Sequence, residues 1–353
     1  MPNRRPSARR TFRLAVPVAA ALLALAAGAG GFFVARAATF TDQASVPGNT
    51  FITDTLAPPT GLTATVVGTN IRLDWTPTTD TYATGYKVLR STTHGSGYSQ
   101  IGTATPYTAT TYTDNTAAAG IRYYYVLQTY FQSWLSVYST EASGCAGICF
   151  DAASSSTPAS ATRFTWSHTV GTGANRILIV GVSIRNSSSQ TVTGVTYAGV
   201  ALTNIGVRAN GTVVRIEMWR LVNPPSGTAN VVVTLSAQAK AVCGATSWTG
   251  VHQTTPLGTF VSATGSTNAP TVNASSATNE VVQDTVAAQG TVTATVGAGQ
   301  TQRWNAGTSD QAAATNVRGA GSTEPGAATV TMSYSLSASA SWAIGAVSLK
   351  PAP

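Results

Sequence analysis

The sequence predicts an all-β protein built from sandwich domains, and three features support this class. Short stretches of alternating apolar and polar residues recur along the chain, separated by turn residues. The second half shows no amphipathic helical period of useful length. Thr, Ser, Ala, Gly and Val dominate, 9% of residues are charged and 43% are hydrophobic, as in extracellular β proteins. The 353 residues suffice for roughly two domains.

The N-terminus predicts a signal peptide over residues 1–37. Its arginine-rich head, residues 1–13, contains no acid, and residues 14–34 carry no charge. Ala35 and Ala37 complete a small-residue cleavage site, so we expect cleavage before Ala38. A retained membrane anchor is the alternative, because 21 uncharged residues could cross a bilayer, although the run is rich in weakly apolar Ala and Gly.

Most of the net charge of +8 belongs to this leader. Six arginines and no acid precede Ala38, so a mature chain would carry +2. The remainder has no Lys/Arg run and no basic helix, which argues against nucleic-acid binding. Arg9 and Arg10 resemble a twin-arginine signal, but paired arginines also occur in ordinary leaders, so the export route stays open.

Residues 38–56 are expected to form the processed N-terminal spacer. The segment ATFTD begins at Ala38, and the segment GNTF begins at Gly48. This stretch resembles the segment after the cleavage site in biofilm-matrix fibre proteins and camelysin-like surface proteins. The resemblance implies maturation by a dedicated signal peptidase and says almost nothing about activity. The alternative is a polar spacer with an accidental likeness.

Residues 57–143 contain seven strand-like stretches at the spacing of a β-sandwich. In the second stretch Ile71, Leu73 and Trp75 face one side, which is the pattern of a half-buried strand and makes Trp75 a core residue. The stretches are GLTATVVG, IRLDW, GYKVLRST, YSQIGTA, TYTD, RYYYVLQTY and WLSVYSTEA.

Over nearly its whole length this region resembles a fibronectin type III domain. The matching residues are Pro58, Pro59, Leu62, Trp75, Tyr86 to Arg90, Tyr112 to Asp114 and Gly120 to Tyr125. The resemblance implies that one of the tyrosines 123 to 125 donates its hydroxyl back to the corner between two strands. The Arg-Gly-Asp tripeptide of adhesive members is absent, so the implied role is a spacer or a weak contact surface.

Residues 144–161 are rich in small and turn residues and predict a linker. Cys145 and Cys149 are close enough to form a local disulfide in an oxidising compartment, although three cysteines allow three pairings and a reduced state. Cys243 lies among apolar residues and is expected to be a buried thiol. No zinc site is expected, because the three histidines are scattered and there is no second cysteine pair.

Residues 162–353 offer about ten further strand candidates, whose number and length predict a two-sheet jelly-roll-like β-sandwich. This region resembles a lectin-like or carbohydrate-module-like unit that recurs in bacterial secreted proteins, in segments such as TYAGVALTNIG and WAIGAVSLKP.

The strand from Thr212 to Leu221 supplies the candidate ligand-binding residues Trp219, Arg215 and Glu217. These alternate onto the face opposite the apolar residues of the strand, where Trp could stack on a sugar ring and the charged pair could bond its hydroxyls. The alternative is an ordinary Arg–Glu pair beside a Trp partly covered by a loop. The other tryptophans of this domain fit the core or its rim equally well.

No catalytic site is expected. A glycosidase needs two carboxylates beside one bond, and the run from Glu217 has Trp219 and Val222 where the acids of laminarinase-like enzymes stand. Glu280 and Asp284 share one strand at even spacing, but the other acids are scattered. Nucleophile-elbow, P-loop and dinucleotide patterns are absent from the sequence, so neither a cofactor nor a metal is predicted.

These observations predict a non-catalytic secreted or cell-surface structural or adhesion protein, in which a fibronectin type III spacer presents a β-sandwich interaction module. The alternative is a carbohydrate-binding accessory protein that docks extracellular polysaccharide through Trp219, and a glycoside hydrolase is a third reading. The expected partner is an extracellular protein or polysaccharide, with membrane contact only through an uncleaved leader.

Overall fold

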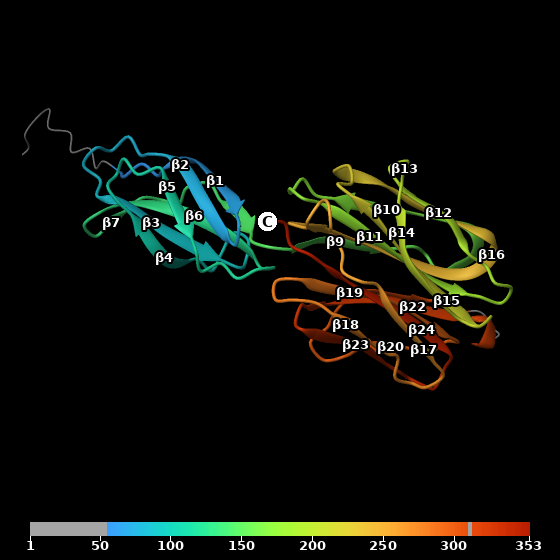
Figure 1. Ribbon diagram of the computed structural model, residues 1–353. Coiled ribbons are helices and arrows are strands. Elements are labelled where there is room, and N and C mark those ends of the chain that lie inside the picture. The colour runs from blue at the N-terminus through green and yellow to red at the C-terminus, as the bar shows by residue number, and fades with distance from the viewer. Residues whose placement is uncertain (1–54, 310–312) are drawn as a thin grey trace, which may run out of the picture. The chain divides into compact units, whose positions relative to one another are not determined.

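The computed structural model describes residues 55–309 and 313–353 (Figure 1). The expected signal peptide with its cleavage site at Ala35, Ala37 and Ala38, and nearly all of the 38–56 spacer, lie outside the described residues. The regular secondary structure of the described part consists of strands and one short 3-10 helix at Ala313–Thr315, which confirms the all-β sandwich class. Within these ranges no helix has the length and apolarity to cross a membrane.

The first domain is a sandwich of two antiparallel sheets. One has the order β1-β2-β5, and the other has the order β4-β3-β6-β7 with β8 also beside β6. The strands are β1 (Thr60–Val67), β2 (Asn70–Thr76), β3 (Gly85–Ser91), β4 (Ser99–Ala104), β5 (Thr111–Asp114), β6 (Arg122–Phe131), β7 (Trp134–Leu135) and β8 (Ala142–Cys145).

The core of this domain contains the residues that alternation predicted. Ile71, Leu73 and Trp75 are buried between the sheets, and the ring of Trp75 meets Tyr86 edge to face with centroids 5.4 Å apart. Tyr125 is the tyrosine that bonds back to the corner, because its hydroxyl donates to Asp114 Oδ2 at 2.8 Å. Arg90 Nη1 donates to the same oxygen at 2.7 Å, so Asp114 ties β3 and β6 to the end of β5.

The stretch 144–161 consists mainly of strands rather than a linker. It contains the end of β8, then β9 (Cys149–Ser155) and the start of β10 (Ala159–Val170). β9 forms an antiparallel ladder with residues 244–249, in which its small Ala and Ser side chains fit beside a partner strand. Small residues resemble a linker in the sequence, but here they form an edge strand.

The second region, residues 149–353, consists of two copies of one sandwich topology. The first copy contains β9, β10, β11 (Ile177–Arg185), β12 (Val192–Tyr197), β13 (Val200–Ala201), β14 (Thr203–Asn210), β15 (Val214–Val222) and β16 (Gly227–Thr249). The second copy contains β17 (Val261–Gly265), β18 (Thr271–Ser275), β19 (Val281–Gln289), β20 (Ala294–Val296), β21 (Thr301–Gly307), β22 (Val317–Pro325), β23 (Thr329–Leu336) and β24 (Trp342–Leu349).

The strand pairings of the two copies correspond one to one. β11 pairs with β15 and with the second half of β16, just as β19 pairs with β22 and β24. β10 and β12 pair with the first half of β16, just as β18 and β20 pair with β23. The edge pairs β14–β15 and β9–β16 match β21–β22 and β17–β24. The long bent strand β16 therefore does in one piece what β23 and β24 do in two.

Local details repeat as well. The ladders of β14–β15 and β21–β22 both shift register at the same place, between Asn204 and Gly206 and between Gln302 and Trp304. Backbone amides donate to the hydroxyls of Ser236 and Ser337 at 3.0 Å in both copies. An asparagine with positive φ precedes β11 and β19 alike, Asn175 at 55° and Asn279 at 72°. The second region is therefore a repeated unit rather than one larger sandwich.

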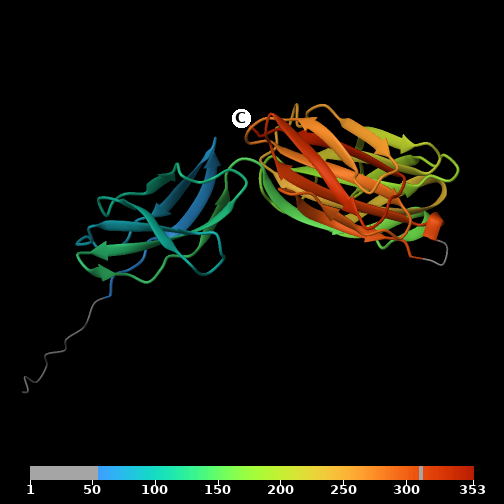
Figure 2. The same cartoon turned by 90° about the horizontal axis from the view of Figure 1, so that it is seen from below.

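The two copies pack through their equivalent inner sheets. The inner sheet of the first copy contains β11, β15 and the second half of β16, and it lies on β19, β22 and β24 (Figures 1 and 2). Seen from below, the orange and red second copy covers the green and yellow first copy. Glycines permit the close approach, since a Cβ on Gly244 would lie 2.2 Å from the Trp304 ring. The outer sheets face away on opposite sides.

Candidate functional site

Strand β15 holds the three predicted ligand-binding residues. Glu217 is 2% exposed, and its Oε1 accepts from Arg215 Nε at 2.7 Å and from the Val192 amide at 3.0 Å. Its Oε2 accepts from Asn204 Nδ2 at 3.4 Å. The carboxylate is thus surrounded by donors from β12, β14 and β15, and it joins these three strands.

Trp219 lies on the same side of β15 as Glu217. Its ring is half-buried against the core of the first copy, which includes Val180 and Val182, and its Nε1 is buried without a hydrogen-bond partner. The structure therefore brings the three predicted residues together, but toward the interior of the first sandwich. A structural role accounts for this geometry, and sugar stacking by Trp219 stays a prediction.

A second polar cluster surrounds Asp284 inside the second copy. Asp284 is fully buried, and its oxygens accept from the Ser322 amide at 2.6 Å, the Ser322 hydroxyl at 3.0 Å and the Tyr334 hydroxyl at 2.8 Å. Gln300 Nε2 in turn donates to Ser322 Oγ at 2.6 Å. Burial raises the pKa of Asp284 to about 7, against the lowering effect of its hydrogen bonds.

Among the described residues of the second copy, the other two acids, Glu280 and Glu324, lie toward strand ends. Asp284 has no exposed surface, and Glu280 lies just before β19 at the strand end. Burial also raises the pKa of Glu324, which lies across from Val282 on β22. Hydrolysis by paired carboxylates requires both groups beside an accessible bond. The geometry of Asp284 suits a structural role, because its oxygens accept hydrogen bonds from β22 and β23.

A third buried polar group, His168, belongs to the first copy. Its Nδ1 lies 2.8 Å from Ser154 Oγ, which also accepts from Trp166 Nε1 at 3.0 Å. Its Nε2 is buried and has no partner. Burial lowers the pKa of His168 to about 4, partly offset by the charge of Asp151. The imidazole is therefore neutral in the folded protein at physiological pH.

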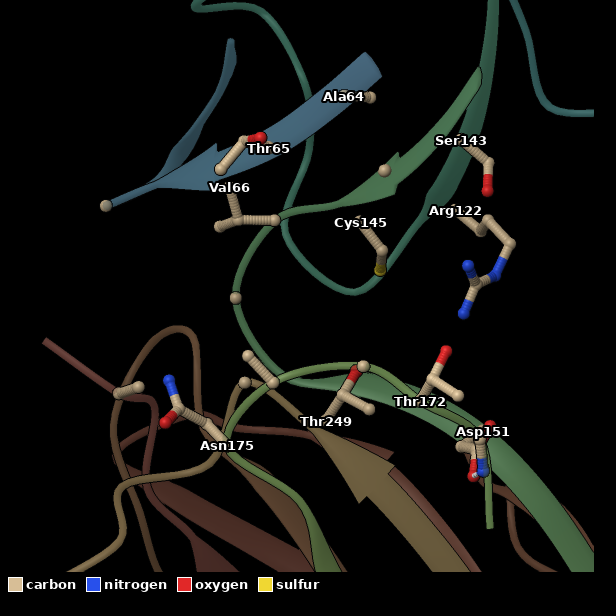
Figure 3. Close-up of a pocket in the computed structure, with 18 of the residues that line it drawn as sticks. Ala64, Thr65, Val66, Arg122, Ser143, Cys145, Asp151, Thr172, Asn175 and Thr249 are labelled. Atoms are coloured by element: carbon tan, nitrogen blue, oxygen red, sulfur yellow. Dashed lines mark hydrogen bonds between the residues drawn. The ribbon is translucent and has the colours of Figure 1, made fainter. Parts of the chain in front are cut away.

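The chain between the two domains contains the disulfide Cys145–Cys149, which joins the end of β8 to the start of β9. Figure 3 shows Cys145 near the end of its strand and Asp151 beside Thr172. Asp151 accepts from the Gly171 amide at 2.8 Å and from Ser247 Oγ at 2.6 Å, so it too holds strands together. Cys243 is a free thiol whose pKa burial raises to about 12.

One surface feature was not found by sequence reasoning. Trp134 is 60% exposed, and Leu135, Val137 and Tyr138 next to it are exposed as well. The signal was present, because WLSVY places four large apolar residues in five positions without strict alternation. Among residues 55–309 and 313–353, no group of three or more His, Cys, Asp or Glu side chains could hold a metal ion.

Comparisons with known proteins give a partial match. No family model matches the chain, and no curated protein matches it. Solved structures that match include a fibronectin type III-like protein from Clostridium thermocellum, with 36% identity over 26% of this chain and 92% of that chain and a TM-score of 0.23. A human fibronectin type III domain matches with 20% identity over 26% of this chain and 71% of that chain, with a TM-score of 0.21.

Proposed function

We propose that this protein is a non-catalytic, secreted or cell-surface structural protein with an adhesive role. The first domain serves as a spacer, and the paired sandwiches of the second region serve as the interaction module. One observation carries the proposal: the buried carboxylates Asp114, Glu217 and Asp284 and the half-buried Asp151 each accept hydrogen bonds that tie strands together. The hydrogen bonds of these four carboxylates support the fold, although Asp151 also lines a pocket together with Gly171 and Thr249.

Two further features support a location outside the cytoplasm. The sequence predicts a cleaved leader before Ala38, and the disulfide Cys145–Cys149 fits an oxidising compartment. The low charged fraction of 9% agrees with this placement, since extracellular β proteins rich in Thr and Ser share it.

N-terminal sequencing of protein from cell-surface, culture-medium and cytoplasmic fractions tests the placement. We expect Ala38 as the first residue in the first two fractions. Intact Met1 confined to the cytoplasm would contradict the proposal. Attachment of cells with and without the gene to a coated surface then tests the adhesive role, and equal attachment would contradict it.

Turnover assays test the absence of catalysis. The purified mature protein is incubated with neutral polysaccharides and with small esters, and released sugar or acid is measured. We expect no turnover above a heat-denatured sample. Turnover that is lost in Asp284→Asn while the melting temperature is unchanged would show that the buried acid is catalytic and would overturn this part of the proposal.

A further inference from the structure

The repeat in the second region leaves two equivalent outer faces. On the first copy the outward residues of β10 and of the first half of β16 are exposed, and on the second copy those of β18 and β23 are exposed. We call them the first and the second hydroxyl face. The first contains Thr165, Ser167, Thr169, Thr228, Asn230 and Thr234, and the second contains Thr271, Asn273, Ser275, Thr329, Thr331 and Ser335.

Strand register makes these positions equivalent one by one. Ser167 pairs with Asn230 and Thr169 with Thr228 in the first copy. In the second copy Asn273 pairs with Thr331 and Ser275 with Thr329 at the same places in the ladder. The residue types are hydroxyl or amide at these four pairs of positions, whereas at the next outward position the first copy has Val232 and the second has Ser333.

Side chains on both faces are ordered by bonds across the strands. The hydroxyls of Thr169 and Thr228 lie 2.7 Å apart on the first face. On the second face Thr331 Oγ1 donates to Asn273 Oδ1 at 2.9 Å. Such cross-strand pairs fix rows of hydroxyls about 4.8 Å apart across the sheet and about 6.8 Å apart along each strand. The rows are therefore preformed rather than assembled on binding.

The faces carry almost no charge. β18 and β23 have no Lys, Arg, Asp or Glu, and β10 has Arg163 beside Thr165 as its one such residue. Solvated sheet faces ordinarily carry both signs of charge. An anionic polymer would need Lys or Arg, and a protein partner would need an apolar centre. A hydroxyl both donates and accepts, so it matches the hydroxyls of a neutral sugar polymer.

The outer sheets lie on opposite sides of the paired copies, as Figure 1 shows for β10 and β12 against β18, β20 and β23. We propose that the second region is a bivalent module whose two hydroxyl faces each bind a neutral polysaccharide chain, so that one molecule links two chains. This inference rests on the proposed adhesive function and names its partner. Single hydroxyl contacts are weak, and two faces on one body supply avidity.

The test uses the mature full-length chain with cellulose powder for pull-down and soluble hydroxyethyl cellulose for cross-linking, which is followed by light scattering. One variant changes the first face, Thr165→Glu with Asn230→Glu, and another changes the equivalent pair, Thr271→Glu with Thr331→Glu. A third variant combines all four changes. The control is Gln100→Glu with Thr103→Glu, two exposed residues of β4. Melting temperatures confirm folding, and scattering without polymer confirms a monomer.

We expect the wild type and the control to bind cellulose and to cross-link the soluble polymer. Each single-face variant should bind about 10²-fold more weakly through lost avidity and should no longer cross-link. The four-site variant should not bind. The bivalent assignment is overturned if a single-face variant still cross-links, and the polysaccharide assignment is overturned if the wild type does not bind or the four-site variant binds as the wild type does. The adhesive role is judged separately by cell attachment.

Discussion

The two copies in the second region share a backbone plan but not a core. Where the first copy has Val180, Trp219 and Val233, strand register places Asp284, Ser322 and Tyr334 in the second. The residues of the first copy pack in an apolar cluster. Those of the second copy form a hydrogen-bonded network in which the Asp284 carboxylate has no exposed surface. Ladder register, bulges and turns therefore define this sandwich, while its interior can be either an apolar cluster or a hydrogen-bonded network.

The largest loss of stability should come from removing a side chain at the contact between the two copies. Trp304 is 5% exposed and its ring lies against Gly244 of the first copy. We expect Trp304→Ala to lower the free energy of unfolding by about 3–5 kcal/mol, as urea denaturation would measure. Trp134→Ala, at an exposed position, is the matched control and should cost less than about 0.5 kcal/mol. A loss below about 1 kcal/mol for Trp304→Ala would mean that the copies are not packed here.

The copies should respond to pH in opposite directions. The pKa of Asp284 is raised to about 7 by burial, so the folded state keeps the proton that the unfolded chain loses near pH 4. The stability that Asp284 contributes is therefore fully present below about pH 4. It amounts to a few kcal/mol, and it is lost as pH rises to about 7. Asp284→Asn removes this loss. Urea midpoints from pH 4 to 7 should therefore rise with pH more steeply in the variant than in the wild type.

His168 acts in the same window with the other sign. Burial lowers its pKa to about 4, so between pH 6.5 and 4 the unfolded chain gains a proton that the folded chain does not. Stability from this group is present above pH 6.5 and is lost as pH falls to about 4. His168→Gln should therefore weaken the destabilisation by acid. Parallel pH profiles for the variant and the wild type would show that His168 is not buried as described.

A smaller effect is expected at the boundary of the first copy. The disulfide Cys145–Cys149 closes a short loop, and chain-entropy reasoning gives it about 2 kcal/mol. Replacing both cysteines with serine should lower the unfolding free energy by up to that amount, and reduction of the wild type with dithiothreitol should match the double variant. A double variant as stable as the oxidised wild type would indicate that the bond contributes nothing.

The smallest effect tests the repeat directly. Asn175 and Asn279 occupy equivalent left-handed positions, and a side chain with a Cβ but no local polar group costs about 1–2 kcal/mol there. We expect Asn175→Ala and Asn279→Ala to destabilise by similar amounts near 1 kcal/mol, while the two Asn→Gly variants stay close to the wild type. Thermal melts of the four variants measure this, and a large inequality between equivalent sites would argue against a common turn.

The sequence was enough for the fold class and for the first domain, because alternation exposes half-buried strands such as Ile71 to Trp75. It did not reveal the repeat, because equivalent core positions hold unlike residues, such as Trp219 and Ser322. What the copies share are turn conformations and ladder register, which depend on partners far along the chain. The same limit explains β16, a single strand of 23 residues whose two halves pair with different strands of the first copy.

The candidate site shows a similar division. Alternation correctly grouped Arg215, Glu217 and Trp219 on one side of a strand, but it could not tell which side another sheet would cover. Burial of Glu217 depends on the Val192 amide and on Asn204, and both contacts are set by the closing of the first sandwich. The exposed hydroxyl faces could not be predicted for the same reason. A row of Thr or Ser residues indicates a binding face only when it is known to face solvent.

One measurement tests the central claim, that equivalent sandwiches meet through their inner sheets and present equivalent faces on opposite sides. Spin labels at Thr165→Cys and Thr271→Cys occupy equivalent outer positions, while Cys145 and Cys149 are paired and Cys243 is buried. Four sheet layers about 10 Å apart predict a label separation of about 30 Å or more by double electron–electron resonance. A distribution centred below about 20 Å would place both faces on one side and would contradict the account.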